Sequence, residues 1–106
     1  MAIALFSGLT TNASGSPVTL AAKPEGSRIG VSVFGTFGGG TILIEFAVDG
    51  TNFVTVTTLS VSAPYKVIDL IPENGSKVRA SLTGATSPNL NCLMSGAFTG
   101  INRTDN

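Results

Sequence analysis

The chain has 106 residues with six basic and six acidic side chains, so its formal net charge at pH 7 is zero. Charged residues make up 11% of the sequence, against about 25% in an ordinary soluble domain. Histidine is absent and Cys92 is the single cysteine. These counts argue against nucleic-acid and membrane partners, which need basic surfaces. They also remove the imidazole of serine and cysteine hydrolases and the ligand set of a structural zinc site.

The N-terminal residues 1–6 are apolar and uncharged, and Ser7 and Gly8 end this run. A secretory signal has a basic residue ahead of a longer apolar stretch, so we expect no signal peptide and interpret residues 3–10 as a first strand. Residues 29–44 form a later uncharged stretch, but their glycines make them unsuitable as a membrane span.

Seven further segments are rich in strand-forming residues, most of them with the two-residue period of a strand, and turn-forming residues separate them. They are residues 17–21, 28–36, 41–48, 52–59, 65–71, 77–83 and 90–98. No window has the period of a helix. The pattern predicts an all-β, antiparallel β-sandwich of about eight short strands, jelly-roll or immunoglobulin-like, with a small barrel as the alternative.

We expect residues 1–101 to form a single domain and residues 102–106 to form a flexible polar tail. Asp49 and Gly50 predict a hairpin tip with a two-residue turn. Val48 falls on the core side of its strand in this pattern. The alternation assigns a common set of side chains to the core: Val31, Val33, Ile42, Ile44, Phe46, Val78, Leu82 and Phe98.

Motifs that could support phosphate, calcium or glycosylation chemistry are weak. The Gly38-Gly39-Gly40 run lacks the helix and lysine of a phosphate-binding loop, so we interpret it as a strand connection with unusual backbone angles. The segment after Asp49 lacks the ligand series of a calcium loop. Chance explains the Asn-x-Ser/Thr triplets in a chain of this composition, and these begin at Asn12, Asn74 and Asn102.

Four carboxylates are candidates for a glycosidase pair: Glu45, Asp49, Asp69 and Glu73. The aromatic platforms that line sugar clefts are scarce in this chain. Asp69 falls on an apolar strand face, which predicts a position near a sheet edge or an ion pair with Lys66 or Arg79. Cys92 alternates with apolar residues and is expected to be buried. We therefore expect no enzyme activity, no cofactor and no metal.

One longer stretch carries a more specific pattern. Residues 35–56 run from a glycine-rich connection into a strand with Glu45 near its middle, and an Asp-Gly turn, the aromatic Phe53 and a valine follow. Residues 78–82 (Val-Arg-Ala-Ser-Leu) form a later strand. This pattern, over roughly residues 35–98, resembles small all-β virion proteins of tailed bacteriophages, many of which have Trp where this chain has Phe37 or Phe53.

The resemblance implies a non-enzymatic virion component made in the host cytoplasm. Within that group a capsid decoration (cement) protein fits best, because such proteins are short, neutral and rich in Thr and Gly. Its partner would be the major capsid protein, whose outer surface it would bind and stabilise. A tail or head-fibre component and a glycan-binding module are the alternatives.

The low charge content leaves the strand edges little protected, which predicts a homo-oligomer. The resemblance suggests a trimer, because decoration proteins of this kind often occupy local three-fold positions. We expect Ile3, Leu5 and Phe6 to be covered by a neighbouring copy or by the shell, and we assign Phe37 and Tyr65 as further contact residues. Binding should depend weakly on salt, since few charges are available.

Overall fold

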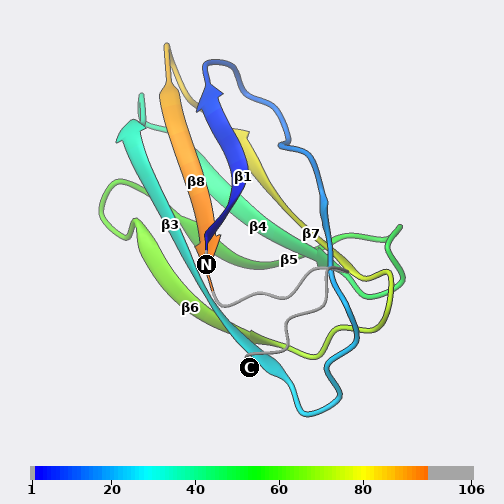
Figure 1. The fold of residues 1–106 in the computed structure, drawn as a ribbon. Coiled ribbons are helices and arrows are strands. Elements are labelled where there is room, and N and C mark those ends of the chain that lie inside the picture. The colour runs from blue at the N-terminus through cyan, green and yellow to red at the C-terminus, as the bar shows by residue number, and fades with distance from the viewer. Residues whose placement is uncertain (1, 96–106) are drawn as a thin grey trace.

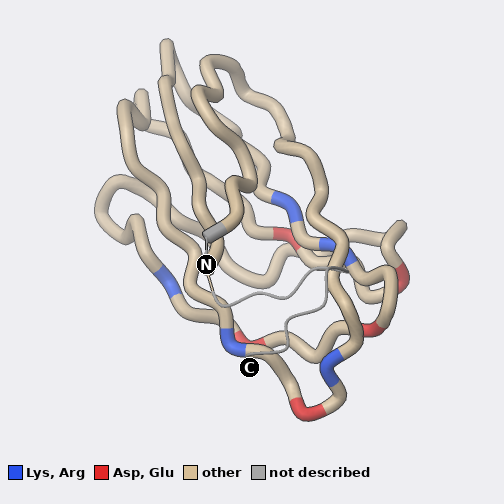
Figure 2. The backbone as a smooth tube through the Cα atoms, viewed as in Figure 1, with Lys and Arg blue, Asp and Glu red and all other residues tan. Residues whose placement is uncertain are grey.

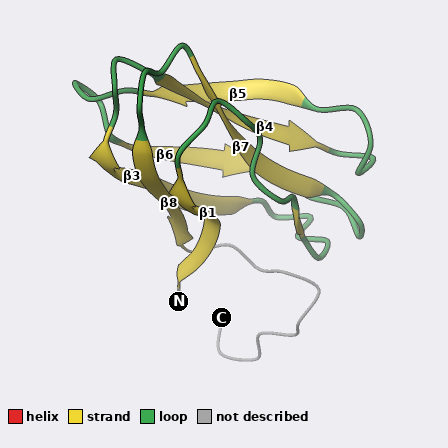
Figure 3. Ribbon diagram, turned by 90° about the horizontal axis from the view of Figure 1, so that it is seen from above, coloured by secondary structure: helices red, strands yellow, loops and turns green. Residues whose placement is uncertain are grey.

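The structure, a computed structural model, describes residues 2–95. This part of the chain contains eight strands and no helix (Figures 1 and 3). The strands are β1 (Ala2–Leu9), β2 (Val18–Thr19), β3 (Ser27–Thr36), β4 (Thr41–Ala47), β5 (Val54–Leu59), β6 (Tyr65–Leu70), β7 (Lys77–Thr83) and β8 (Asn89–Ser95). Each overlaps a segment that its residue pattern predicts to be a strand.

The strands form two four-stranded antiparallel sheets that pack face to face. Sheet A has the order β1-β8-β3-β6, and sheet B has the order β2-β7-β4-β5. Figure 3 shows the two layers nearly edge-on, with β5 in one layer and β1, β8 and β3 in the other. The predicted β-sandwich is confirmed.

The order of the strands follows from one long hairpin. β4 pairs with β5, β3 with β6, β2 with β7 and β1 with β8, so paired segments lie at similar distances before and after the connection at Asp49. When such a hairpin rolls up, alternate pairs fall in different sheets. The result is the eight-stranded jelly roll rather than the immunoglobulin arrangement. Asp49 and Gly50 therefore lie at the tip of the whole fold as well as of one hairpin.

The core lies between the inner faces of the two sheets. Seven of the eight predicted core residues are buried, and Phe98 lies outside the described residues. Alternate residues of β3, β4, β7 and β8 supply most of this core, as their two-residue period requires. Further buried apolar side chains come from the remaining strands and their connections: Leu5, Phe6, Leu20, Leu59 and Leu70.

The connection between β4 and β5 is longer than the predicted two-residue turn. It spans residues 48–53, and Val48 is 52% exposed, so its predicted place on the core side is wrong. Asp49 is the physical cause. One carboxylate oxygen accepts the backbone N–H groups of Thr51 (2.9 Å) and Asn52 (2.8 Å), and the other accepts the side-chain amide of Asn52 (2.6 Å). These bonds favour a longer, carboxylate-capped loop.

Other predicted features have a structural explanation. Gly38 has a φ of +60°, and its carbonyl accepts the N–H of Thr86 at 2.9 Å, which confirms unusual backbone angles in the glycine run. Asn12 exchanges two hydrogen bonds with the backbone of Ala85. Cys92 is fully buried, and this burial raises the pKa of its thiol to about 12. Among the described residues, no helix is long and apolar enough to span a bilayer.

Candidate interaction surface

The outer face of sheet B carries a connected polar cluster. Glu45 in β4 lies opposite Arg79 in β7, and the same Glu45 oxygen accepts the Arg79 Nε–H at 2.7 Å and the Ser81 hydroxyl at 2.8 Å. The hydroxyls of Ser81 and Ser14 are 2.7 Å apart, which ties the β1–β2 connection to β7. Each polar group in this chain of contacts therefore has a partner within the molecule.

An aromatic ring completes the cluster. The guanidinium carbon of Arg79 lies 4.0 Å from the centre of the Phe53 ring, a cation–π contact. The Glu45 side chain is only 15% exposed. Partial burial alone would raise the pKa of Glu45, but hydrogen bonds from Arg79 and Ser81 and the Arg79 charge together lower it below its ordinary value. Glu45 is thus held as a carboxylate.

The cluster explains why the sequence pattern of residues 35–56 and 78–82 contains these residue types. That pattern contains a mid-strand glutamate, an aromatic after the Asp-Gly turn, and a later strand with Val-Arg-Ala-Ser. In the fold, the Asp49 turn brings Phe53 to Arg79, and strand register brings Arg79 to Glu45. The residues of this pattern therefore form contacts that hold β4, β7 and the β4–β5 connection together.

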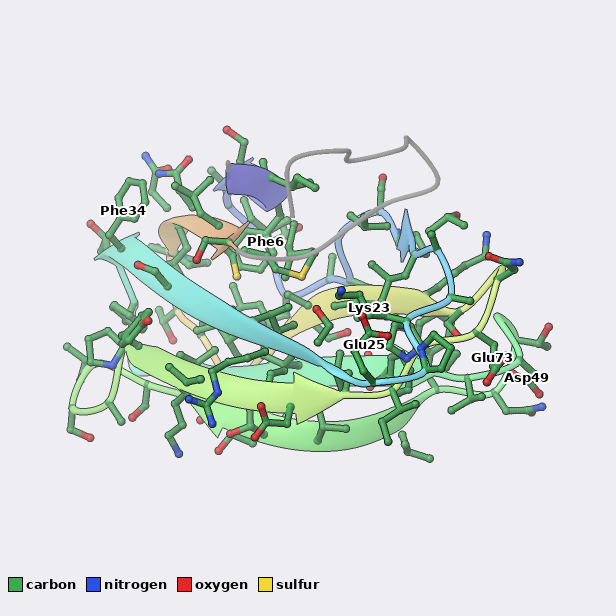
Figure 4. The ribbon with its side chains drawn as sticks, turned by 60° about the horizontal axis from the view of Figure 1, so that its bottom comes forward. Phe6, Lys23, Glu25, Phe34, Asp49 and Glu73 are labelled. Atoms are coloured by element: carbon green, nitrogen blue, oxygen red, sulfur yellow. The ribbon has the colours of Figure 1, made fainter. Side chains whose placement is uncertain are left out.

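The outer face of sheet A has a different character. Strand register places Leu93, Ser32 and Tyr65 in one row across β8, β3 and β6, and places Val67 beside Gly30 in the next row. Phe34, Tyr65 and Val67 are 50%, 58% and 49% exposed. Figure 4 shows Phe34 pointing away from the interior of the sandwich. We refer to Phe34, Tyr65, Val67 and Leu93 as the sheet A face.

Tyr65 leans across its neighbouring strand instead of standing free. A Cβ atom added to Gly30 would lie 2.8 Å from the Tyr65 hydroxyl oxygen and 3.2 Å from that of Ser95. Gly30 is diagonal to Tyr65 in the ladder, within reach of a long aromatic side chain. The absence of a side chain at Gly30 therefore lets the phenol ring lie flat along the sheet A face.

The sheet A face has one ion pair at its border. Arg28 and Asp69 face each other across β3 and β6, with Arg28 Nε 3.2 Å from the carboxylate, and both side chains are more than 70% exposed. The predicted edge position of Asp69 is confirmed, because β6 ends sheet A. Its predicted pairing with Lys66 or Arg79 is wrong, since the ladder brings Arg28 opposite it. Figure 2 shows the charged residues in the middle and lower parts of the view.

The structure separates the five predicted contact residues. Leu5 and Phe6 are 1% and 7% exposed and belong to the core of their own domain, so no neighbouring copy is needed to cover them. Register shifts around Phe6 turn both side chains inward, which simple alternation does not predict. Ile3 is half-buried, Phe37 is half-buried against the core, and Tyr65 is exposed on the sheet A face.

Other surface features are weaker candidates for a functional site than the sheet A face. Among the described residues no group of three or more acidic or cysteine side chains could hold a metal ion. An open hollow of about 440 Å³ lies between the start of β3 and the end of β6. Arg28, Asp69 and Glu25 line it together with backbone and aliphatic atoms. It has polar groups but no aromatic platform of the kind that binds a sugar ring.

A scan against protein-family models finds no match for the chain, and a search of curated proteins finds none either. Function must therefore be inferred from the two outer faces, the fold and the sequence pattern.

Proposed function

We propose that this chain is a structural protein of a tailed-bacteriophage virion that binds the outer surface of the capsid through the sheet A face. One observation carries the proposal. The sheet A face exposes Phe34, Tyr65 and Val67 with a single ion pair at its border, whereas the outer face of sheet B is occupied by its own hydrogen bonds. Clustered exposed apolar side chains mark protein contact sites.

The fold supports this proposal by analogy. Jelly rolls are common in viral capsid proteins and in lectins, and a fold alone does not decide between such functions. The likeness of residues 35–56 to small virion proteins favours the capsid, and the polar cluster shows how that pattern stabilises a jelly roll. The partner would be the major capsid protein.

Binding would be driven by removing apolar surface from water. Each Å² of apolar area buried contributes about 25 cal/mol, part of which is offset by the cost of association. The chain has no net charge, and its sheet A face has few ionic groups, so electrostatic attraction contributes little. Many copies on one shell would reinforce the subunit contacts that each copy spans.

Co-sedimentation with capsids of the phage that encodes the chain, purified without it, tests this proposal. Phe34→Lys should weaken binding about tenfold or more, because burial of a phenylalanine is worth about 1.5–3 kcal/mol. Val54→Lys is the matched control. Val54 is 61% exposed on β5 of sheet B, and its variant should bind as the natural chain does. Circular dichroism checks that both variants keep their β-sheet.

The binding results test the assigned face and the capsid assignment separately. Equal binding by Phe34→Lys and the natural chain would contradict the assigned face. Failure of the natural chain to bind capsids would contradict the capsid itself, and binding to purified tails or to saccharides would then favour the fibre or glycan alternatives. Raising the salt from about 0.1 M to about 1 M shortens the Debye length from about 10 Å to about 3 Å and should change capsid binding little.

A further inference from the structure

The outer edge of β6 is long and regular enough to pair with a strand of another chain. The two sheets end in β1, β6, β2 and β5. β1 has register shifts on either side of Phe6, β5 has one opposite the Ile44–Glu45 step, and β2 is only two residues long. Irregular register and short length are devices that keep edge strands from pairing. β6 has six residues in unbroken register with β3, so it alone among these four edges lacks both devices.

The pairing pattern identifies which backbone groups of β6 face outward. The Val33 N–H donates to the Pro64 carbonyl at 2.9 Å, so these residues form a hydrogen-bonded pair of the β3–β6 ladder. Hydrogen-bonded pairs alternate along an antiparallel ladder, so every second residue of β6 turns its N–H and C=O away from β3. The residues with outward groups are Tyr65, Val67 and Asp69.

We propose that two copies of the chain associate through this edge as an antiparallel β6–β6 pair, with the two-fold axis at Val67. In this register Val67 of one copy lies opposite Val67 of the other, and Tyr65 lies opposite Asp69 in both directions. Every outward N–H and C=O of these residues then has a partner. The two copies of sheet A join into one continuous sheet.

The register is self-complementary, which favours a second copy over an unrelated strand. Two β-branched valines face each other at the axis, a favourable cross-strand pair. Tyr65 lies opposite Asp69 of the second copy and Lys66 lies opposite Ile68, so like charges do not oppose each other. The chain also has zero net charge, so two copies have no overall repulsion to overcome.

Pairing at this edge has a consequence for the sheet A face. A two-fold axis perpendicular to the joined sheet puts the outer faces of both copies on the same side, so the exposed Phe34, Tyr65 and Val67 are doubled into one surface. An isologous contact of this kind closes at a dimer. The dimer does not depend on the proposed capsid function, and it differs from the trimer that the sequence resemblance suggests.

Sedimentation equilibrium of the full chain at micromolar concentration, without capsids, tests the pair. The natural chain should have twice the monomer mass of 10.7 kDa. Val67→Pro should be monomeric and still folded, because proline removes an outward N–H and is tolerated at the open side of an edge strand. Val67→Thr, which keeps both the N–H and the β-branch, should remain dimeric.

A second variant keeps the test decisive if the proline variant does not fold. Val67→Lys places two like charges face to face at the axis and should also yield monomers, whereas Val54→Lys should remain dimeric. Amide hydrogen exchange locates the contact. Protection of Tyr65, Val67 and Asp69 should rise with protein concentration, while protection of Lys66, Ile68 and Leu70, bonded to β3, should not change.

Three results would overturn the β6 pair: a monomeric natural chain, a trimer, or dimers of Val67→Lys with unchanged exchange at Val67. None of them bears on capsid binding, which is measured with shells present. Conversely, loss of capsid binding by Phe34→Lys with an intact dimer would leave the β6 pair in place. The two proposals can therefore fail separately.

Discussion

On the outer face of sheet B, side chains bond one another: Arg79 spans the gap between Glu45 and the Phe53 ring, and Ser81 joins the same carboxylate. On the outer face of sheet A, Phe34 and Val67 meet solvent, and Tyr65 rests on a glycine. Both faces are built from four strands of one rolled hairpin. The difference shows how a chain with few charges can concentrate its polar bonds on one face and leave the other for contact with a partner.

The largest expected effect lies in the core that both sheets share. Ile44→Ala should lower the free energy of unfolding by about 2–5 kcal/mol, because Ile44 is completely buried and its truncation leaves a cavity. Leu43→Ala, on the outer side of the same strand, should cost clearly less, since Leu43 is only half-buried. Urea denaturation measures both variants. Equal losses would mean that the two sides of β4 are not distinguished as described.

Two of the ion pairs, Arg79–Glu45 and Arg28–Asp69, offer a sharper comparison of the faces. Arg79→Ala should cost about 1–3 kcal/mol, because it leaves the mostly buried Glu45 carboxylate without its main partner. Arg28→Ala should change stability by about 0.5 kcal/mol or less, since that pair is exposed to water. Urea denaturation measures the free energy of unfolding of both variants. If both variants lost a comparable free energy of unfolding, the outer faces of sheets A and B would not differ in the strength of their polar contacts.

The last prediction concerns how stability changes with pH in acid. Hydrogen bonds from the backbone of Asn52 and Thr51, and then from the Asn52 side chain, lower the pKa of Asp49 from its ordinary 3.8 to about 2. A lowered folded-state pKa contributes stability above the ordinary pKa, and this contribution is lost as the pH falls from about 4 toward 2. Asp49→Asn should flatten that part of the curve of unfolding free energy against pH. An unchanged curve would show that the carboxylate does not hold the loop.

Local pattern predicted much of this fold. Strand-forming residues, most of them alternating, and the turns between them located all eight strands and seven buried core residues, because a half-buried strand must alternate. The pattern also located the tip of the hairpin at Asp49 and Gly50. The local pattern could not predict the length of this loop, because the length depends on which backbone N–H groups donate hydrogen bonds to the Asp49 carboxylate. Nor could the pattern predict that both Leu5 and Phe6 are buried, because two consecutive inward side chains require a β-bulge.

The candidate surface was less accessible to sequence reasoning. Tyr65 was assigned as a contact, but Phe34 and Val67 join it only once β6 is known to pair with β3. The same long-range pairing brings Arg28 to Asp69, two residues that are distant in sequence and carry no local signal. Glu45 and Arg79, which belong to the sequence pattern of residues 35–56 and 78–82, bond each other. The face without such bonds is the one proposed to bind.

Cryo-electron microscopy of capsids purified with and without this chain tests the central proposal most directly. We expect added density on the outer surface of the shell only when the chain is present. In that density the sheet of β1, β8, β3 and β6 should face the shell, with Phe34, Tyr65 and Val67 at the contact and the Glu45–Arg79 cluster turned away. A shell without added density, or a jelly roll bound with sheet B toward the shell, would contradict it.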